Sequence, residues 1–221
     1  MLGIVIPAHN EQDCIEASVT AAAIAANHPT LLGEQAVVIV VADGCRDRTA
    51  ELARSCGATV IEVDNKNVGA SRAIGAAAAI ALGARWLAFT DADTIVAPDW
   101  LTCQLSCAAD AVCGTVSVSV WPTKAEIART CFLRSYRDED GHSHIHGANF
   151  GVSTAAYLTA GGFQDLTVHE DVALVRALEG TGAMICWSAL PRVETSARLH
   201  SRTVAGFGAT LCGWNDGLFA A

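Results

Sequence analysis

Short apolar runs alternate with longer segments of helical periodicity throughout the first half of the chain. The apolar runs cover residues 2–6, 36–41, 59–63 and 86–89, and the helical segments between them cover about 11–27, 47–55 and 68–82. This alternation is typical of right-handed βαβ units, in which the strands are parallel and the helices cover the sheet. We therefore predict an α/β fold whose first half forms a parallel sheet covered by helices.

The alternation ends at Trp121-Pro122, and the second half of the chain is less regular. Before that point we expect a helix that begins near Pro98 and a strand over residues 112–120. After it we expect a helix over 124–140 that runs into a charged loop at 137–141, a strand at 145–152, a helix at 170–179, a strand at 183–187 and a weakly apolar last helix. With 221 residues, 52% of them hydrophobic, the chain can bury one substantial core, so we expect a single domain.

Composition excludes several classes of protein. The formal net charge of −9 at pH 7, without any basic stripe, opposes nonspecific binding to nucleic acid or to anionic membrane. The nine cysteines are an odd number and contain no Cys-x-x-Cys pair, which is typical of reduced thiols. No basic and apolar leader precedes the first apolar run, and no window of about 18 apolar residues occurs, so we expect a cytoplasmic protein without a transmembrane segment.

Two aspartates one residue apart, Asp91 and Asp93, follow the fourth apolar run. Carboxylates at positions i and i+2 of an extended segment project to one face, and at the carboxyl end of a parallel strand that face borders the ligand crevice of an open sheet. Mg²⁺ and Mn²⁺ prefer oxygen ligands and are commonly held by one or two carboxylates together with substrate phosphates. An isolated Asp-x-Asp pair also fits a solvated turn, but polar residues at the other strand ends favour the metal site.

Those polar residues follow the first and second apolar runs. The first run is followed by Pro7-Ala8-His9-Asn10-Glu11 and the second by Ala42-Asp43-Gly44-Cys45-Arg46-Asp47. Asn10 and Asp47 would also serve as helix N-caps, and Asp43-Gly44 as a turn. A third segment, Asn67-Val68-Gly69-Ala70-Ser71-Arg72, opens a helix with a glycine that permits close approach of a ligand and an arginine beside it, which is a natural seat for phosphate.

Taken together and in order, these segments resemble the inverting glycosyltransferases of family 2, which have the GT-A fold and use nucleotide-diphosphate sugars. The similar segments are residues 4–11, 41–49 and 67–72, Asp91-Ala92-Asp93, Gly147-Ala148-Asn149-Phe150, Gly161-Gly162-Phe163 and His169-Glu170-Asp171. Each motif alone is weak, whereas the ordered series covers nearly the whole chain. The resemblance implies one GT-A domain over 1–221, with a nucleotide-binding half at 1–94 and an acceptor-side half at 95–221. It also implies a mixed, mostly parallel central sheet with helices on both of its faces.

The resemblance also implies a metal-dependent transfer of a sugar from UDP or GDP to the hydroxyl of an acceptor. The class of acceptor stays open, but individual residues have implied roles. The nucleotide would be bound by Pro7, Ala8, His9, Glu11, Asp43, Asn67, Gly69, Arg72, Asp91 and Ala92. Mn²⁺ or Mg²⁺ would be held by Asp93, Asp91 and His200, and the diphosphate would be clamped by Arg198 and Arg202. Contacts to the donor or acceptor sugar would come from Gly147, Ala148 and Asn149. The proton of the acceptor hydroxyl would be taken by Asp171, with Glu170 beside it.

Two further features of the sequence have alternative interpretations. The alternating His142, His144 and His146 share one face of an extended segment, which fits either a second metal or histidines that contact the acceptor or lie at the solvent edge. The segments 137–141 and 192–202 are charged, lack strong periodicity and flank the candidate site. We expect both to be poorly ordered without ligand and to close over a bound diphosphate.

Three other functions fit the sequence less well. A sugar-1-phosphate nucleotidyltransferase would need a glycine-rich, basic loop after its first strand, and residues 7–11 provide none. A dinucleotide-dependent oxidoreductase would need Gly-x-Gly-x-x-Gly after Ile6. A catalytically silent nucleotide-sugar-binding subunit is disfavoured by the intact Asp91, Asp93 and Asp171.

Overall fold

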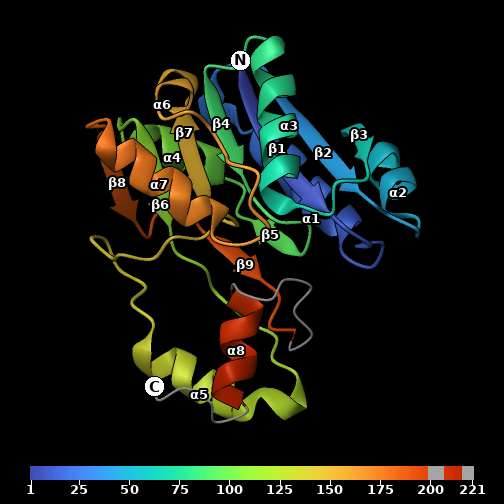
Figure 1. Ribbon diagram of the computed structural model, residues 1–221, viewed down its shortest axis with the longest axis vertical. Coiled ribbons are helices and arrows are strands. Elements are labelled where there is room, and N and C mark those ends of the chain that lie inside the picture. Colours follow the sequence, from blue (N-terminus) through green and yellow to red (C-terminus); the bar gives the residue numbers. More distant parts are fainter. Residues whose placement is uncertain (199–206, 216–221) are drawn as a thin grey trace.

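The computed structural model describes residues 1–198 and 207–215, and its centre is a twisted β-sheet flanked by helices (Figure 1). The first four strands are β1 (Leu2–Ala8), β2 (Ala36–Asp43), β3 (Thr59–Val63) and β4 (Trp86–Phe89). β1 lies between β2 and β4, β3 lies at the edge beside β2, and all of these pairs are parallel. All four strands lie where the apolar runs predict them.

The second half of the chain extends the same sheet and introduces one antiparallel strand. β7 (Phe150–Ser153) lies between β4 and β6 (Ala111–Gly114) and is antiparallel to both, whereas β8 (Ile185–Ser188) is parallel to β6. The strand order of this seven-stranded sheet is β3-β2-β1-β4-β7-β6-β8. The mixed, mostly parallel sheet confirms the predicted fold class.

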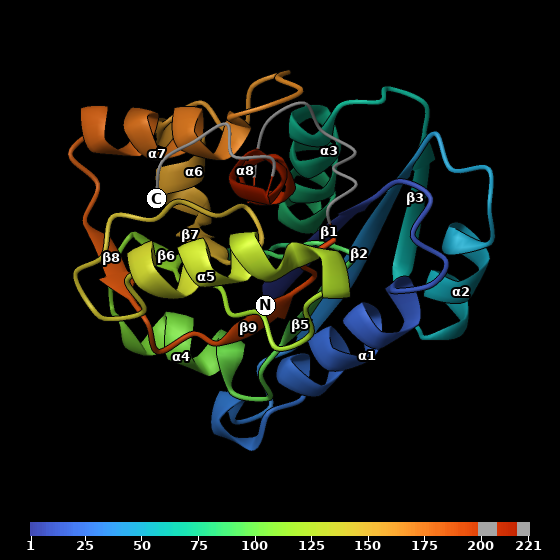
Figure 2. The same ribbon diagram turned by 90° about the horizontal axis from the view of Figure 1, so that it is seen from below.

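Helices cover both faces of the sheet, as the view in Figure 2 shows. α1 (Ile15–Ala26), α2 (Thr49–Ser55) and α4 (Trp100–Ser106) pack on one face, where Ile4 and Ile6 belong to a buried cluster. α3 (Val68–Ala81), α6 (Thr154–Thr159) and α7 (Glu170–Gly180) pack on the other face, where Val5 belongs to a second cluster. Because side chains alternate along a strand, the unbroken apolar sequence of β1 supplies both cores.

A smaller substructure lies beyond the carboxyl ends of the parallel strands (Figure 1). There β5 (Thr94–Val96) pairs with β9 (Val193–Thr195), and α5 (Glu126–Ser135) packs against α8 (Phe207–Asn215). Two 3-10 turns, η1 (Pro29–Leu31) and η2 (Thr123–Ala125), complete the described elements. Within residues 1–198 and 207–215, the helices are all too short or too polar to cross a membrane.

Several elements of the second half differ from the predictions. The strand predicted at 112–120 ends at Gly114, and the helix predicted at 124–140 ends at Ser135 because Tyr136 is extended, with ψ 126°. β5, β9 and α6 are not among the predicted elements, since the two strands have three residues each and α6 has fewer than two helical turns.

The charged loop at 137–141 is held by several contacts, contrary to the expectation that it is poorly ordered. Asp140 accepts hydrogen bonds from the Ser188 hydroxyl at 2.9 Å and from the Ala189 N–H at 2.8 Å. The Asp138 carboxylate forms an ion pair with Arg192 at 2.6 Å. In the second segment expected to be mobile, residues 199–202 lie outside the described part of the chain.

We expect Gly75→Ala to destabilise the protein, although alanine normally favours a helix over glycine by about 0.5–1 kcal/mol. Gly75 lies where α3 packs on β1 and β2, and an added Cβ would come 2.4 Å from Val5 Cγ1 and 3.2 Å from Val41 Cγ2. The neighbouring side chains must shift to make room for the Cβ, and this shift should lower the free energy of unfolding by about 1–3 kcal/mol. Urea denaturation measures the loss.

Gly180→Ala, near the end of α7, is the matched control, because no heavy atom lies within 4 Å of its added Cβ. This variant should be neutral or more stable by up to about 1 kcal/mol. Equal effects of the two substitutions would contradict the close packing of α3 on the sheet.

Candidate functional site

A cavity of about 1000 Å³ opens at the carboxyl ends of β1, β2 and β4 and is completed by the starts of α3 and α7 and by the pair α5 and α8. The predicted site residues that line it are Pro7, Ala8, His9, Glu11, Asp43, Asn67, Arg72, Asp91, Ala92, Asp93, Gly147, Ala148, Glu170, Asp171 and Arg198. Two other predicted residues, Gly69 and Asn149, are not part of this lining. The predicted His200 and Arg202 lie outside the described residues.

The Asp43 carboxylate, at the end of β2, is saturated by donors from the protein. Its Oδ1 accepts the N–H groups of Asn65 and Lys66, both at 2.7 Å, and its Oδ2 accepts the Asn67 N–H and the Ser71 hydroxyl, both at 2.9 Å. Burial would by itself raise the pKa of Asp43, but these hydrogen bonds hold it below its usual value. The carboxylate therefore orders the loop before α3 and has no oxygen lone pair left over for a nucleotide base.

The resemblance predicts that Arg72 holds base or phosphate, but in the structure its guanidinium bridges two carboxylates. Its Nη2 lies 2.6 Å from Asp91 Oδ1, and its Nη1 donates to Glu170 Oε1. Arg72 is 3% exposed and lies under Gly147, where an added Cβ would come 2.4 Å from Nη2. The guanidinium also lies 5.8 Å from the centre of the Phe163 ring. A buried cation is costly unless nearby carboxylates compensate its charge, so the Arg72 guanidinium is held by these contacts within the protein.

Gly69 contacts the protein and not the cavity. An added Cβ would come 2.3 Å from the Gln164 carbonyl oxygen, and the Gly69 N–H donates to the Leu166 carbonyl at 3.1 Å. The next N–H of α3, that of Ala70, donates to Asn67 Oδ1 at 3.0 Å. The glycine is therefore explained by the close approach of another chain segment, and the predicted phosphate seat at this helix start is closed.

Asn149 is also occupied by the protein. It is 1% exposed, and its Oδ1 accepts the indole N–H of Trp100 at 2.8 Å. Its Nδ2 donates to the carbonyl oxygens of Thr115 at 2.6 Å and Pro191 at 2.8 Å. The side chain predicted to contact a sugar thus joins α4 to two loops.

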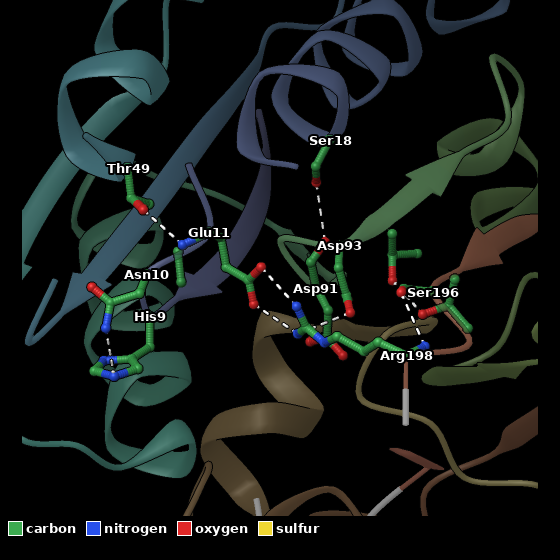
Figure 3. A network of polar contacts seen from close by, with 12 residues as sticks. His9, Asn10, Glu11, Ser18, Thr49, Asp91, Asp93, Ser196 and Arg198 are labelled. Atoms are coloured by element: carbon green, nitrogen blue, oxygen red, sulfur yellow. Dashed lines mark hydrogen bonds and ion pairs between the residues drawn. The ribbon is translucent and has the colours of Figure 1, made fainter. Parts of the chain in front are cut away.

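Arg198 lies between Glu11, which follows β1, and Asp93, which follows β4, as Figure 3 shows. Its guanidinium donates to the Glu11 carboxylate at 2.7 and 2.9 Å, and its Nη2 lies 2.9 Å from Asp93 Oδ2. Burial, and after it the charge of Asp91, raises the pKa of Asp93 to about 6. Three carboxylates therefore gather here, and Arg198 offsets part of their charge.

The donor atoms of this cluster fit a hard divalent cation. Asp91 and Asp93 provide carboxylate oxygens, the ligand type that Mg²⁺ and Mn²⁺ prefer. In the described part of the chain, no three His, Cys, Asp or Glu side chains are placed to enclose a metal by themselves. An ion at Asp93 would therefore take further ligands from water or a bound diphosphate, which is the usual arrangement for Mg²⁺.

The two carboxylates at the start of α7 have different surroundings. Glu170 is 5% exposed and is paired with Arg72. Asp171 is half-buried at the edge of the cavity, and its Oδ2 accepts the Gly147 N–H at 2.9 Å. Of the two predicted catalytic residues, Asp171 is the one whose carboxylate is not bound in an ion pair with a described residue.

The three alternating histidines use ring nitrogens for hydrogen bonds within the protein. His142 Nδ1 accepts the His144 N–H at 3.0 Å, His144 Nε2 accepts the Arg137 N–H at 3.2 Å, and His146 Nε2 lies 2.9 Å from the Tyr136 hydroxyl. Their rings are stacked, with centroids 5.4 and 5.8 Å apart, and do not converge on one point. The geometry thus favours histidines at the cavity edge over a second metal.

The sequence predictions do not include the aromatic wall of the cavity, which consists of Phe132, Tyr136, Phe207 and Trp214. The first two belong to α5 and its C-cap, and the last two belong to α8. The four-residue spacing of Phe132 and Tyr136 is a usable signal, because such residues share a helix face. No local pattern shows that α8, much later in the chain, completes the wall.

Comparisons with known proteins identify the fold. Residues 3–158 match the sequence model of the family described as Glycosyl transferase family 2. None of the curated proteins compared with this chain matches it.

Two solved structures illustrate the likeness, which at their low identities concerns the fold. S. aureus TarS 1–349 in complex with UDP-GlcNAc is 13% identical with a TM-score of 0.66, and the match covers 93% of this chain and 61% of that one. Glucosyl-3-phosphoglycerate synthase from Mycobacterium tuberculosis, in complex with Mn²⁺, UDP and phosphoglyceric acid, is 17% identical with a TM-score of 0.62 over 90% of this chain and 71% of that one. The chain thus spans less than two thirds of the TarS structure.

Asn149→Ala should lower the free energy of unfolding by about 2–4 kcal/mol, because it leaves the buried Trp100 N–H and two carbonyl groups without their partner. Urea denaturation measures the loss. Asn27→Ala is the control, since Asn27 is exposed and makes a single side-chain bond to the Ala23 carbonyl; its effect should stay within about 0.5 kcal/mol. Wild-type stability together with weakened nucleotide-sugar binding in Asn149→Ala would instead support the sugar contact predicted from the sequence.

Proposed function

The chain belongs to glycosyl transferase family 2, and we propose on that basis that it is a metal-dependent, inverting glycosyltransferase. Its donor would be a nucleotide-diphosphate sugar and its acceptor a hydroxyl compound. The observation that carries the proposal is the convergence of Asp91, Asp93 and Asp171 on one cavity at the carboxyl ends of the parallel strands. A metal site and a base on opposite sides of one crevice are what such a transfer requires.

We propose Mn²⁺ or Mg²⁺ as the cofactor, with Asp93 as a direct ligand and Asp91 beside it. Such an ion, when bound, relieves the negative charge of the departing diphosphate. The M. tuberculosis synthase has been solved with Mg²⁺ and UDP and with Mn²⁺ and UDP. Arg198, which contacts Glu11 and Asp93, is close enough to exchange these partners for diphosphate oxygens.

Asp171 is the proposed general base. The acceptor oxygen bonds to the anomeric carbon while the nucleoside diphosphate leaves with the electron pair of the broken bond, and the acceptor proton passes to the Asp171 carboxylate. The Gly147 N–H holds Oδ2 at 2.9 Å, so the carboxylate has a fixed orientation before an acceptor binds. Glu170 acts through Arg72 as a positioning residue, because its Oε1 is paired with the buried guanidinium.

We propose UDP as the donor nucleotide, because the solved TarS and synthase structures contain UDP or UDP-GlcNAc. Pro7, Ala8 and His9 at the end of β1 line the part of the cavity that would hold it. The proposal includes the cytoplasmic location expected from the sequence. It is supported by the nine cysteines, which are all free thiols and suit a reducing compartment.

Asp93→Ala should remove most Mn²⁺-dependent binding of UDP while the protein stays folded, because it removes a direct metal ligand. Calorimetric titration with and without Mn²⁺ should show that the metal-dependent affinity falls by about tenfold or more. Asp99→Ala is the control, since Asp99 is exposed and makes no side-chain cap hydrogen bond. Unchanged Mn²⁺-dependent binding in Asp93→Ala would refute the metal assignment.

Asp171→Asn should lower turnover by about 100-fold or more with little change in donor affinity, because a general base acts only in the transition state. Turnover is measured with Mn²⁺ as release of the nucleoside diphosphate from UDP-glucose, UDP-GlcNAc and GDP-mannose. Glu179→Gln, at an exposed position of α7, should change neither quantity.

Two outcomes of this assay would count against the proposal. A wild-type protein that binds UDP but releases no nucleotide from any donor would favour a catalytically silent binding subunit. An Asp171→Asn variant whose donor affinity falls as much as its turnover would show that Asp171 serves binding and not proton transfer.

A further inference from the structure

The part of the cavity next to α5 and α8 is lined by the aromatic wall defined above. The rings of Phe132 and Tyr136 are stacked with centroids 4.5 Å apart, and Phe132 meets Phe207 edge-on at 5.7 Å. These contacts hold the rings in fixed orientations. A fixed aromatic surface packs well against a flat apolar face of a ligand, such as the C–H face of a sugar ring.

The cationic side chains that line the cavity are either distant from this wall in the chain or already paired. Arg46 and Lys66 belong to the loops that follow β2 and β3. Arg72 and Arg198 each contact two carboxylates. Among the described residues, α5 and α8 themselves contribute no arginine or lysine to the lining, so the aromatic wall carries no cation of its own for a phosphate or carboxylate group of an acceptor.

His146 adds one directed hydrogen-bond donor between the aromatic wall and Asp171. The Tyr136 oxygen accepts the Val116 N–H at 2.7 Å, which leaves its own proton for His146 Nε2 at 2.9 Å. Nε2 is thereby an acceptor, so the neutral ring carries its hydrogen on Nδ1. Burial lowers the pKa of His146 to about 4, so the ring stays neutral above roughly pH 5.

The Nδ1–H of His146 has no acceptor in the described part of the chain, and the residue lines the cavity. The next residue, Gly147, donates its N–H to Asp171. A ligand oxygen bonded to His146 would therefore lie beside the hydroxyl that gives its proton to Asp171.

We propose that the aromatic wall and His146 form the acceptor subsite, and that the subsite takes an uncharged sugar, with its ring against the aromatic wall and a hydroxyl bonded to His146 Nδ1–H. This inference rests on the proposed function, because Asp171 marks the acceptor side only if it is the base. It distinguishes this chain from an enzyme whose acceptor is a sugar-like acid or a phosphate ester.

Binding of uncharged sugars to the protein that holds UDP and Mn²⁺ tests the proposal. The probes are methyl α-D-glucopyranoside, methyl α-D-mannopyranoside and methyl β-D-galactopyranoside, with 3-phosphoglycerate as the charged comparison, and affinities are measured by saturation-transfer NMR titration. At least one glycoside should bind, and 3-phosphoglycerate should not. Binding of 3-phosphoglycerate in preference to every glycoside, or no glycoside binding, would overturn the proposal.

Two substitutions of His146 separate its donor from its contact with Tyr136. In His146→Asn the amide nitrogen takes the place of Nδ1, whereas in His146→Gln the amide oxygen takes the place of Nε2 and still accepts from Tyr136. His146→Gln should weaken glycoside binding by about tenfold, and His146→Asn by less than about threefold. Trp214→Leu should weaken the same binding without a change in UDP affinity, and glycoside binding that survives both His146→Gln and Trp214→Leu would show that the subsite lies elsewhere.

The affinity for UDP with Mn²⁺ reports on the proposed function, and the affinity for glycosides reports on the acceptor subsite. The probes are therefore also titrated without UDP. Glycoside binding that depends on His146 in a protein that binds neither UDP nor GDP with Mn²⁺ would confirm a sugar site at the aromatic wall and refute the transferase. UDP binding without any glycoside binding would refute the acceptor subsite and leave the proposed transferase standing.

Discussion

The buried guanidinium of Arg72 joins the two halves of this protein. It extends from α3 and meets Asp91 at the end of β4 and Glu170 at the start of α7. Removal of one partner of a buried ion pair costs about 3–5 kcal/mol, because a charge is then left without compensation. The neighbouring Gly147 has no room for a Cβ above this guanidinium, and its N–H holds Asp171. The position of the proposed base therefore depends on an arginine that touches no substrate in this arrangement.

The Asp93 carboxylate, at the other side of the cavity, is held at a cost in stability. The pKa of Asp93 is raised to about 6 in the folded protein, above the value of 3.8 for a free side chain, so the folded state binds the proton more tightly than the unfolded state. This stabilisation is present at low pH and is lost as the pH rises through about 6, which means that the ionised site destabilises the fold at neutral pH. The contact with Arg198 reduces that cost. A site whose charges repel one another until a cation arrives is expected where function, and not stability, has selected the residues.

The sequence predicts the placement of strands and strand ends better than the partners of individual side chains. β1 to β4 follow from unbroken apolar runs, and Asp91 and Asp93 reach the cavity because the carboxyl ends of parallel strands share one edge of the sheet. Arg72 and Glu170 are 98 positions apart in the chain, and no local pattern shows that they meet. Gly69 and Asn149 contact distant segments of the protein and do not line the cavity, and no local pattern shows these contacts either. The packing of distant segments therefore determines which of the predicted residues line the cavity.

The cavity has two chemically different ends, and the difference orders the proposed reaction. The end at β4 gathers carboxylates that need a cation, which suits a metal-bound diphosphate. The end at α5 and α8 presents aromatic rings and a neutral histidine, which suits a ligand without charge. Asp171 lines the same cavity and is held by the backbone of Gly147, so the acceptor proton would pass to Asp171 while the diphosphate leaves toward the carboxylates and the cation at β4.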